Sequence, residues 1–196
     1  MLGLMAVALP AYIMFVISFL SVTQRVDADV LVIEAWVQVD MMESVAEEFA
    51  RNHYSLLLIS GLQHNPDEEA SAVKGSLRRT LLRLEELGVP RDRLIPCPAP
   101  FAEWRRTAKS AQAVRGKVHE LGLKPRGINV ITEGTHARES WVAYRHIFGK
   151  ETPVGIVAVP KPRPPGFRWW TSTGGWFWIT KDFLGWLKEY LFPIRT

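Results

Sequence analysis

The sequence predicts an α/β fold: a three-layer sandwich with a mostly parallel five-stranded sheet, preceded by one N-terminal transmembrane helix. From residue 29 to residue 159, apolar and β-branched runs alternate with segments of helical periodicity. This alternation is typical of a parallel sheet whose crossover helices cover both faces. Residues 1–24 carry no charged side chain, which indicates a separate apolar segment. The length of 196 residues fits one folded domain besides that segment.

Strands and helices are assigned from this alternation in chain order. The strands are predicted at residues 29–35, 54–60, 93–97, 127–132 and 153–159, each a short apolar run. The helices are predicted at residues 41–53, 68–87, 105–121 and 136–148, where apolar side chains recur every three or four positions. Glycines at positions 88, 122 and 149 follow the last three helices, as is common where a helix ends.

The composition excludes several classes of protein. A hydrophobic content of 47% with 22% charged residues excludes a disordered or fibrous chain. Cys97 is the single cysteine, so neither an intrachain disulfide nor a cysteine-cluster zinc site can form. The net charge is +4 and no run of Lys and Arg exceeds two residues, so we expect no nucleic-acid partner.

The N-terminal segment is predicted to be an uncleaved membrane anchor covering residues 1–24. Residues 4–22 form an uncharged stretch of about the length that crosses a bilayer as a helix. No basic residue precedes this stretch, and residues 21–23 make a poor cleavage site. A signal peptide and a buried core helix are the alternatives. The expected partner of residues 4–22 is the lipid bilayer.

The C-terminal extension, residues 161–196, is rich in tryptophan. It follows the domain predicted over residues 25–160 and holds five of the eight Trp residues. Trp178, Phe183 and Trp186 are predicted to share one face of a helix. Two interpretations stay open: a terminal helix that covers the sheet, or an amphipathic helix at a membrane interface.

Polar side chains gather at the carboxyl ends of the predicted strands, where open α/β sheets bind ligands. Glu34 ends an otherwise apolar strand, so we expect it to act as an acid–base residue or as a ligand acceptor. The alternative is that Glu34 caps a neighbouring helix or pairs with an arginine.

The densest polar cluster follows the fourth strand. Thr135 is predicted as the N-cap of a helix whose first turn carries His136 and Arg138, an arrangement that favours an anionic group. We expect His136 to be the second acid–base residue. In the alternative interpretation His136 bonds only to the backbone and Arg138 pairs with a surface acid.

The remaining predicted ligand-binding residues are Ser60, Gly61, Glu69, Thr107 and Thr132. Ser60 and Gly61, at the end of the second strand, are interpreted as a tight turn close to a ligand, and the alternative is that Gly61 is a loop glycine without a ligand contact. No metal is expected, since neither an HExxH motif nor another ligand spacing occurs. Walker A, GxGxxG and GxSxG motifs are also absent, which argues against P-loop, dinucleotide and α/β-hydrolase chemistry.

The order of several short motifs resembles the ElyC/SanA/YdcF family. The matching segments are DVLVIEAW at residues 29–36, LISG at 58–61, Glu69-Ala70, LGVP at 87–90, Thr107 with Ala111, and VITEGTHARES at 130–140. The resemblance covers about residues 29–160. It departs from the family at Glu34-Ala35-Trp36, where a Gly-rich turn is usual, and at Leu62, where a second Gly is usual. These departures indicate a subgroup with its own ligand.

This resemblance implies a Rossmann-like domain at the bacterial cytoplasmic membrane, with a role in envelope biogenesis. The expected ligand is anionic or nucleotide-like, or a polysaccharide, peptidoglycan or lipid-linked precursor, and an adenosyl-type cofactor is implied for some members. The resemblance favours an extracytoplasmic domain on a single-pass anchor, and it does not decide whether the protein is an enzyme. A non-catalytic scaffold module and a soluble nucleotide-binding or adenosyl-cofactor-binding protein are the alternatives.

Overall fold

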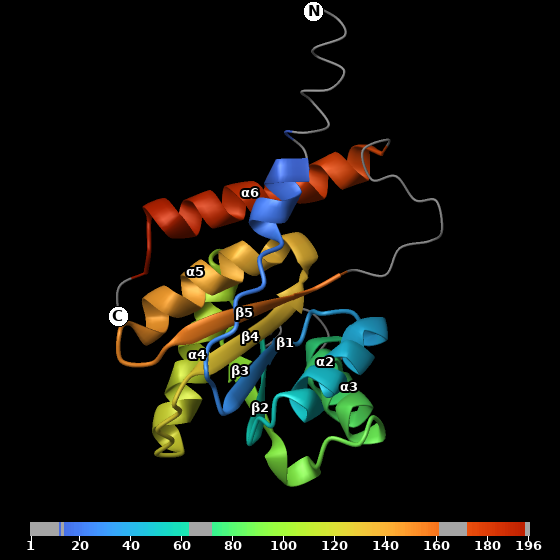
Figure 1. Cartoon of the computed structure of the whole chain (residues 1–196), viewed down its shortest axis with the longest axis vertical. Helices are drawn as coiled ribbons and strands as arrows, with labels where there is room; N and C mark the ends of the chain where they lie inside the picture. Colours follow the sequence, from blue (N-terminus) through green and yellow to red (C-terminus); the bar gives the residue numbers. More distant parts are fainter. Residues whose placement is uncertain (1–11, 13, 63–71, 161–171, 195–196) are drawn as a thin grey trace, which may run out of the picture.

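The structure is a computed structural model that describes residues 12, 14–62, 72–160 and 172–194 (Figure 1). Its strands are β1 (Val30–Glu34), β2 (Leu56–Leu62), β3 (Leu94–Ala99), β4 (Ile128–Glu133) and β5 (Val154–Val159). Its α-helices are α2 (Met42–Arg51), α3 (Ala72–Glu86), α4 (Arg106–Glu120), α5 (Ala137–Phe148) and α6 (Thr173–Leu191). Short 3-10 turns, η1 (Val39–Met41), η2 (Arg91–Arg93) and η3 (Gly134–His136), precede α2, β3 and α5.

The five strands form one sheet in the order β3-β2-β1-β4-β5. Every pairing between these strands is parallel, so the predicted α/β fold is confirmed and the sheet is wholly parallel in the described residues. From β1 the chain builds outward through β2 and β3, then crosses back to β4 on the other side of β1. This Rossmann-like arrangement creates a switch point between β1 and β4, where such sheets bind ligands.

Two apolar layers hold the helices against the sheet. Leu31 and Ile33 of β1 face the core layer that includes α2 and α3. Val30 and Val32 face the opposite layer, which includes α4 and α5. Because alternate residues of a strand point to opposite faces, a continuous apolar run is what a sheet covered on both sides requires. The three-layer sandwich is therefore confirmed.

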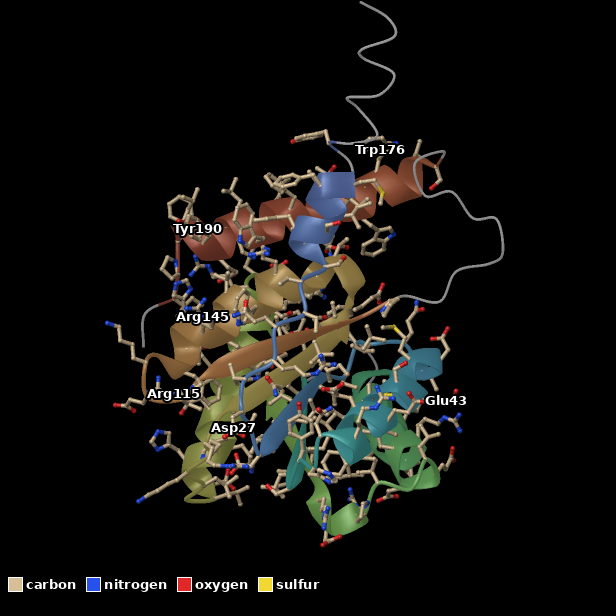
Figure 2. All side chains as sticks on the ribbon, in the orientation of Figure 1. Asp27, Glu43, Arg115, Arg145, Trp176 and Tyr190 are labelled. Carbon is tan, nitrogen blue, oxygen red and sulfur yellow. The ribbon has the colours of Figure 1, made fainter. Side chains whose placement is uncertain are left out.

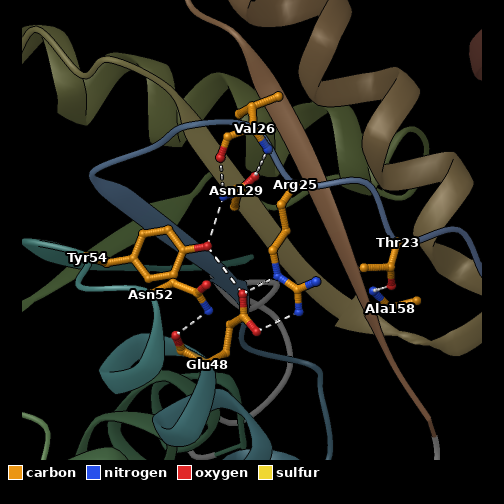
Figure 3. Close-up of polar contacts among 8 residues, drawn as sticks. All are labelled: Thr23, Arg25, Val26, Glu48, Asn52, Tyr54, Asn129 and Ala158. Atoms are coloured by element: carbon orange, nitrogen blue, oxygen red, sulfur yellow. Dashed lines mark hydrogen bonds and ion pairs between the residues drawn. The ribbon is translucent and has the colours of Figure 1, made fainter.

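A polar network fixes the segment before β1 to the domain (Figure 3). Arg25 donates to both carboxylate oxygens of Glu48, at 2.7 and 2.8 Å. The Tyr54 hydroxyl donates to Glu48 at 3.3 Å and accepts from the Asn129 amide at 2.8 Å. Gln24 adds an antiparallel bridge to Ile156 of β5. The chain is thus bound to the domain by these contacts immediately after its uncharged segment.

Helix α6 forms an additional layer beyond the sandwich. It packs on α5 and not on the sheet (Figure 1). The extension thus packs on the domain over α5 and does not cover the sheet, because α2 to α5 already cover both sheet faces. Ser172 begins α6 by accepting a hydrogen bond from the Gly175 amide at 3.0 Å.

The predicted membrane segment, residues 4–22, lies largely outside the described residues. Residues 14–20 are helical and Phe19 packs edge-on against Trp186 of α6, with ring centroids 4.8 Å apart. Among the helices that the structure describes, none combines the length and the apolar character needed to cross a bilayer.

Candidate functional site

Glu34 lies at the switch point with one carboxylate oxygen satisfied and the other unpaired. Its Oε2 accepts hydrogen bonds from the Thr132 hydroxyl at 2.7 Å and from the Ser140 hydroxyl at 2.9 Å. The side chain is 1% exposed, and its Oε1 has no hydrogen-bond partner within the part of the chain that the structure describes. A buried polar atom without a partner is costly, so this oxygen is the unmet hydrogen-bond acceptor of the site.

The strand alternation explains why Glu34 meets these partners. Glu34 follows Val30 and Val32 by steps of two, so it points to the sheet face covered by α4 and α5. Ser140 lies on the first turn of α5, and Thr132 lies near the end of β4 beside β1. The structure thus joins Glu34 to the predicted residue Thr132, and it adds Ser140, which the sequence analysis did not predict.

His136 lies between carboxylates and a hydroxyl. Its Nδ1 is 3.5 Å from Glu139 Oε2 and 3.5 Å from Asp182 Oδ1. Its Nε2 is 3.4 Å from the Thr107 hydroxyl. The ring of Trp36 meets the imidazole edge-on at a centroid distance of 4.7 Å. Both ring nitrogens are therefore engaged.

The surrounding charges raise the pKa of His136 above its ordinary value. Burial by itself acts to lower this pKa, but the hydrogen bond to Asp182 and the charges of Glu34 and Glu139 outweigh it. Burial raises the pKa of Glu139, against the opposing effect of His136 and Lys188. The site consequently favours a protonated imidazole.

Helix α6 supplies residues that sequence analysis missed. Asp182 accepts a hydrogen bond from the Thr135 hydroxyl in addition to its contact with His136. Gly185 lets α6 approach Glu139, because a Cβ at this position would lie 2.0 Å from Glu139 Oε2. Lys188 Nζ lies 3.7 Å from Glu139 Oε1. The spacing of Asp182, Gly185 and Glu189 on one helical face was the available signal.

The first turn of α5 differs from its predicted role. His136, and not Thr135, occupies the N-cap position of α5, and no side chain caps it. The 3-10 turn η3 places Thr135 before the helix, where its hydroxyl donates to Asp182. The position predicted to attract an anionic ligand group is thus already beside a carboxylate of the same chain.

Ser60 and Gly61 lie inside β2 and form no turn, so that prediction is wrong. The Ser60 hydroxyl is 3.1 Å from the hydroxyl of Tyr144, and both side chains are buried. Burial raises the pKa of Tyr144 well above its ordinary value. A Cβ at Gly61 would lie 3.0 Å from the Cβ of Ala35, so this glycine permits close packing beside β1.

Arg138 contacts the N-terminal helical residues. Its guanidinium lies 3.9 Å from the ring centroid of Phe19 and donates to the Phe19 carbonyl. Burial lowers the pKa of Arg138.

Among the predicted site residues, the structure brings together Glu34 with Thr132, and His136 with Thr107. Glu69 lies outside the described residues.

The arrangement can exchange protons and accept hydrogen bonds from a ligand. Within the described ranges, no three His, Cys, Asp or Glu side chains are grouped closely enough to hold a metal ion. Two surface hollows of about 440 and 240 Å³ lie elsewhere, against the C-terminal half of α4 around Arg115 and His119.

Comparison with known proteins gives no match: no family model matches the chain, and neither does any curated protein.

Proposed function

We propose that this chain is a membrane-anchored α/β protein of bacterial envelope biogenesis that binds a hydroxyl-bearing ligand at its switch point. The ligand would be the sugar part of a polysaccharide or peptidoglycan precursor, or of a nucleotide-like compound. The observation that carries this proposal is the buried Glu34 carboxylate, whose Oε2 accepts two hydroxyl donors while Oε1 has no partner in the described residues.

A sugar hydroxyl suits the free oxygen of Glu34. Thr132 and Ser140 fix the carboxylate through Oε2, so Oε1 is held in one orientation before a ligand arrives. A hydroxyl donating to Oε1 would remove the penalty of burying that oxygen unpaired. Glutamate and aspartate bind ribose hydroxyls at the strand ends of related sheets for the same reason.

Trp36 follows Glu34 closely in the sequence, and we expect a sugar or base ring of the ligand to pack on its side chain. Its side chain is 46% exposed although its ring also contacts His136. An aromatic face next to a few placed polar groups is the usual composition of a small-molecule site. An adenosyl-type cofactor would provide both a ribose hydroxyl for Glu34 and a ring for Trp36. The cofactor would supply its own transfer chemistry.

The charged side chains around Glu34 and His136 favour a neutral sugar over a phosphate as the ligand group that binds there. The charges of Glu34, Glu139 and Asp182 act on His136, and Lys188 contacts Glu139 at 3.7 Å. A phosphate in this position would meet more carboxylates than cations. The anionic part of a nucleotide-like or lipid-linked ligand would therefore lie outside the Glu34 cluster.

Glu34 and His136 are the proposed acid–base pair if the bound ligand is transformed. His136 would deliver a proton from Nε2, the nitrogen nearest the Thr107 hydroxyl. A non-catalytic binding module is the second candidate function. One observation favours it: both ring nitrogens of His136 already contact groups of the protein, as in a residue that holds neighbours in position.

The anchor in this proposal is the segment of residues 4–22. Its length and its lack of charge support a bilayer-spanning helix. The side chains of Tyr12, Met14 and Phe15 are 65%, 60% and 67% exposed in the described structure, which is unusual for apolar groups that face water together.

The test is the variant Glu34→Gln, with Glu47→Gln as the matched control on the exposed face of α2. Small molecules that co-purify with each protein are released by denaturation and identified by mass spectrometry. We expect a sugar-containing compound with the wild type and with Glu47→Gln, and its loss with Glu34→Gln. Equal amounts of every compound in all three samples would overturn the proposal.

The same variants separate catalysis from binding. If the protein is an enzyme, His136→Gln abolishes turnover of the identified compound and retains its binding. If it is a binding module, no turnover is detected with the wild type, and His136→Gln changes only the affinity.

A further inference from the structure

We infer that the outer face of α6 lies on a lipid surface. This outer face consists of Trp176, Phe177, Leu184, Tyr190 and Leu191. The inference rests on the membrane anchor of the proposed function, because it places a second element of the same chain at the bilayer.

Helix α6 has the reverse of the polarity expected in water. Its only fully buried residues are two acids, Asp182 and Glu189. Its outer face is apolar, with exposed fractions from 40% at Trp176 to 64% at Phe177. A helix of a water-soluble domain normally turns its apolar stripe inward, and a contiguous exposed apolar face marks an interaction surface.

Contacts with the rest of the domain hold the inner face of α6. Asp182 is bound to His136 and Thr135, and Glu189 lies 3.2 Å from Lys188 Nζ. Gly185 lies on the same inner face, where a Cβ would collide with Glu139. Turning α6 about its axis to bury its aromatic side chains would break the contacts of Asp182 with His136 and Thr135 and the contact of Lys188 with Glu139, so these contacts fix the orientation of the helix.

The charge and side-chain types of the outer face fit an anionic lipid interface. Since both acids of α6 point inward, the outer side carries no carboxylate. Lys181 is exposed, and its Nζ stands 4.9 Å from the ring centroid of Trp178. Trp and Tyr with a neighbouring Lys are the side chains that lie at the headgroup level of membranes.

The outer face is continuous with the chain's uncharged N-terminal segment. Residues 14–20 lie across α6 (Figure 1), where Phe19 contacts Trp186. Figure 2 shows Trp176 and Tyr190 near the two ends of α6, on the layer farthest from α2 and α3. A bilayer that holds residues 4–22 would therefore lie next to α6, which favours lipid over a protein partner as the occupant of this face.

The test places a polarity-sensitive fluorophore on single cysteines of the full-length chain. Leu184→Cys labels the outer face, where Leu184 is 56% exposed, and Leu82→Cys on α3 is the control, where Leu82 is 47% exposed. Cys97 gives no background, because it is 1% exposed and burial raises the pKa of its thiol to about 12. Each labelled protein is reconstituted into vesicles of phosphatidylethanolamine and phosphatidylglycerol, with or without brominated acyl chains.

We expect the label at position 184 to emit at shorter wavelength in vesicles. We also expect brominated lipid to quench it severalfold more than the label at position 82. If the protein floats with the vesicles and both labels are quenched equally little, the anchor stands and this inference is overturned. If the protein does not float, the anchor itself fails. A blue shift at position 184 without bromine quenching would assign the face to a protein partner, and it also overturns the inference.

Discussion

Asp182 Oδ1 of α6 lies 3.5 Å from Nδ1 of His136, which precedes α5. A carboxylate from the last helix thus completes the surroundings of a histidine that lies far earlier in the chain. This contact joins the layer beyond the sandwich to the switch point of the sheet. Through this contact, α6 contributes a residue to the candidate site.

The contact predicts a pH dependence of stability. The pKa of His136 is raised in the folded state above its unfolded value of about 6.5. The stabilisation that protonated His136 gives the folded state is therefore fully present below about pH 6.5, and it is lost as the pH rises through the raised folded-state pKa. We expect the melting temperature of the wild type to fall over this range, and that of Asp182→Asn to fall less. Thermal unfolding followed by circular dichroism between about pH 6 and pH 9 measures both slopes. Parallel curves would contradict the role given to Asp182.

The hydroxyl of Thr132 predicts a stability effect at Glu34. Thr132→Val removes one of the donors to Glu34 Oε2 without changing the side-chain shape. The free energy of unfolding should fall by about 1–3 kcal/mol, because a buried carboxylate loses a hydrogen bond. Urea denaturation measures this change, with Thr180→Val at an exposed position of α6 as the control. A change of the same size in both variants would refute the specific contact.

The ion pair of Arg25 with Glu48 predicts that the segment before β1 is a structural clamp. Arg25→Met leaves the 6% exposed Glu48 carboxylate with Tyr54 as its one side-chain donor among the described residues, so we expect a loss of about 1.5–3 kcal/mol. Arg126→Met removes the ion pairs of this exposed arginine with Asp27 and Asp29 and should change stability by less than about 1 kcal/mol. The two variants are compared by denaturant unfolding. An equal effect would mean that the network contributes no more than a surface pair does.

Two glycines predict stability changes of opposite sign. A Cβ at Gly155 would lie 2.0 Å from Asn129 Oδ1 and 2.7 Å from the Val26 amide nitrogen, so Gly155→Ala should destabilise the fold by about 1–3 kcal/mol or more. Gly116 lies inside α4, and among the described residues nothing beyond its own stretch of helix lies within 4 Å of the place that an alanine methyl would take, so Gly116→Ala should stabilise the fold by about 0.5–1 kcal/mol. Melting temperatures of the two variants check both signs at once.

Much of the architecture follows from sequence because strand and helix periods are local properties. The apolar run of β1 predicts a strand buried on both faces, and the structure confirms it at Val30 and Leu31, which face opposite layers. The position of Glu34 at a strand end is equally local, since it depends only on where the apolar run stops.

Other predictions failed where the outcome depends on contacts across the chain. Gly61 was expected to form a turn, but pairing with Pro98 of β3 extends β2 past it. Thr135 was expected as an N-cap, but the turn η3 places its hydroxyl against Asp182. A local rule assigns a turn or a cap to the nearest polar residue, and only the neighbouring strand or helix decides otherwise.

The sequence by itself determined the class of fold and the uncharged character of residues 1–24, because both follow from the order of apolar and polar side chains. It also marked Glu34 and His136, because ionisable groups at strand and helix ends stand out in an apolar pattern. Only the tertiary structure decided that Ser140 holds Glu34, that Asp182 holds His136, and that α6 turns its acids inward. These relationships join residues that are far apart in the chain, 106 positions for Glu34 and Ser140, and long-range packing selects one partner among many of the same chemical type.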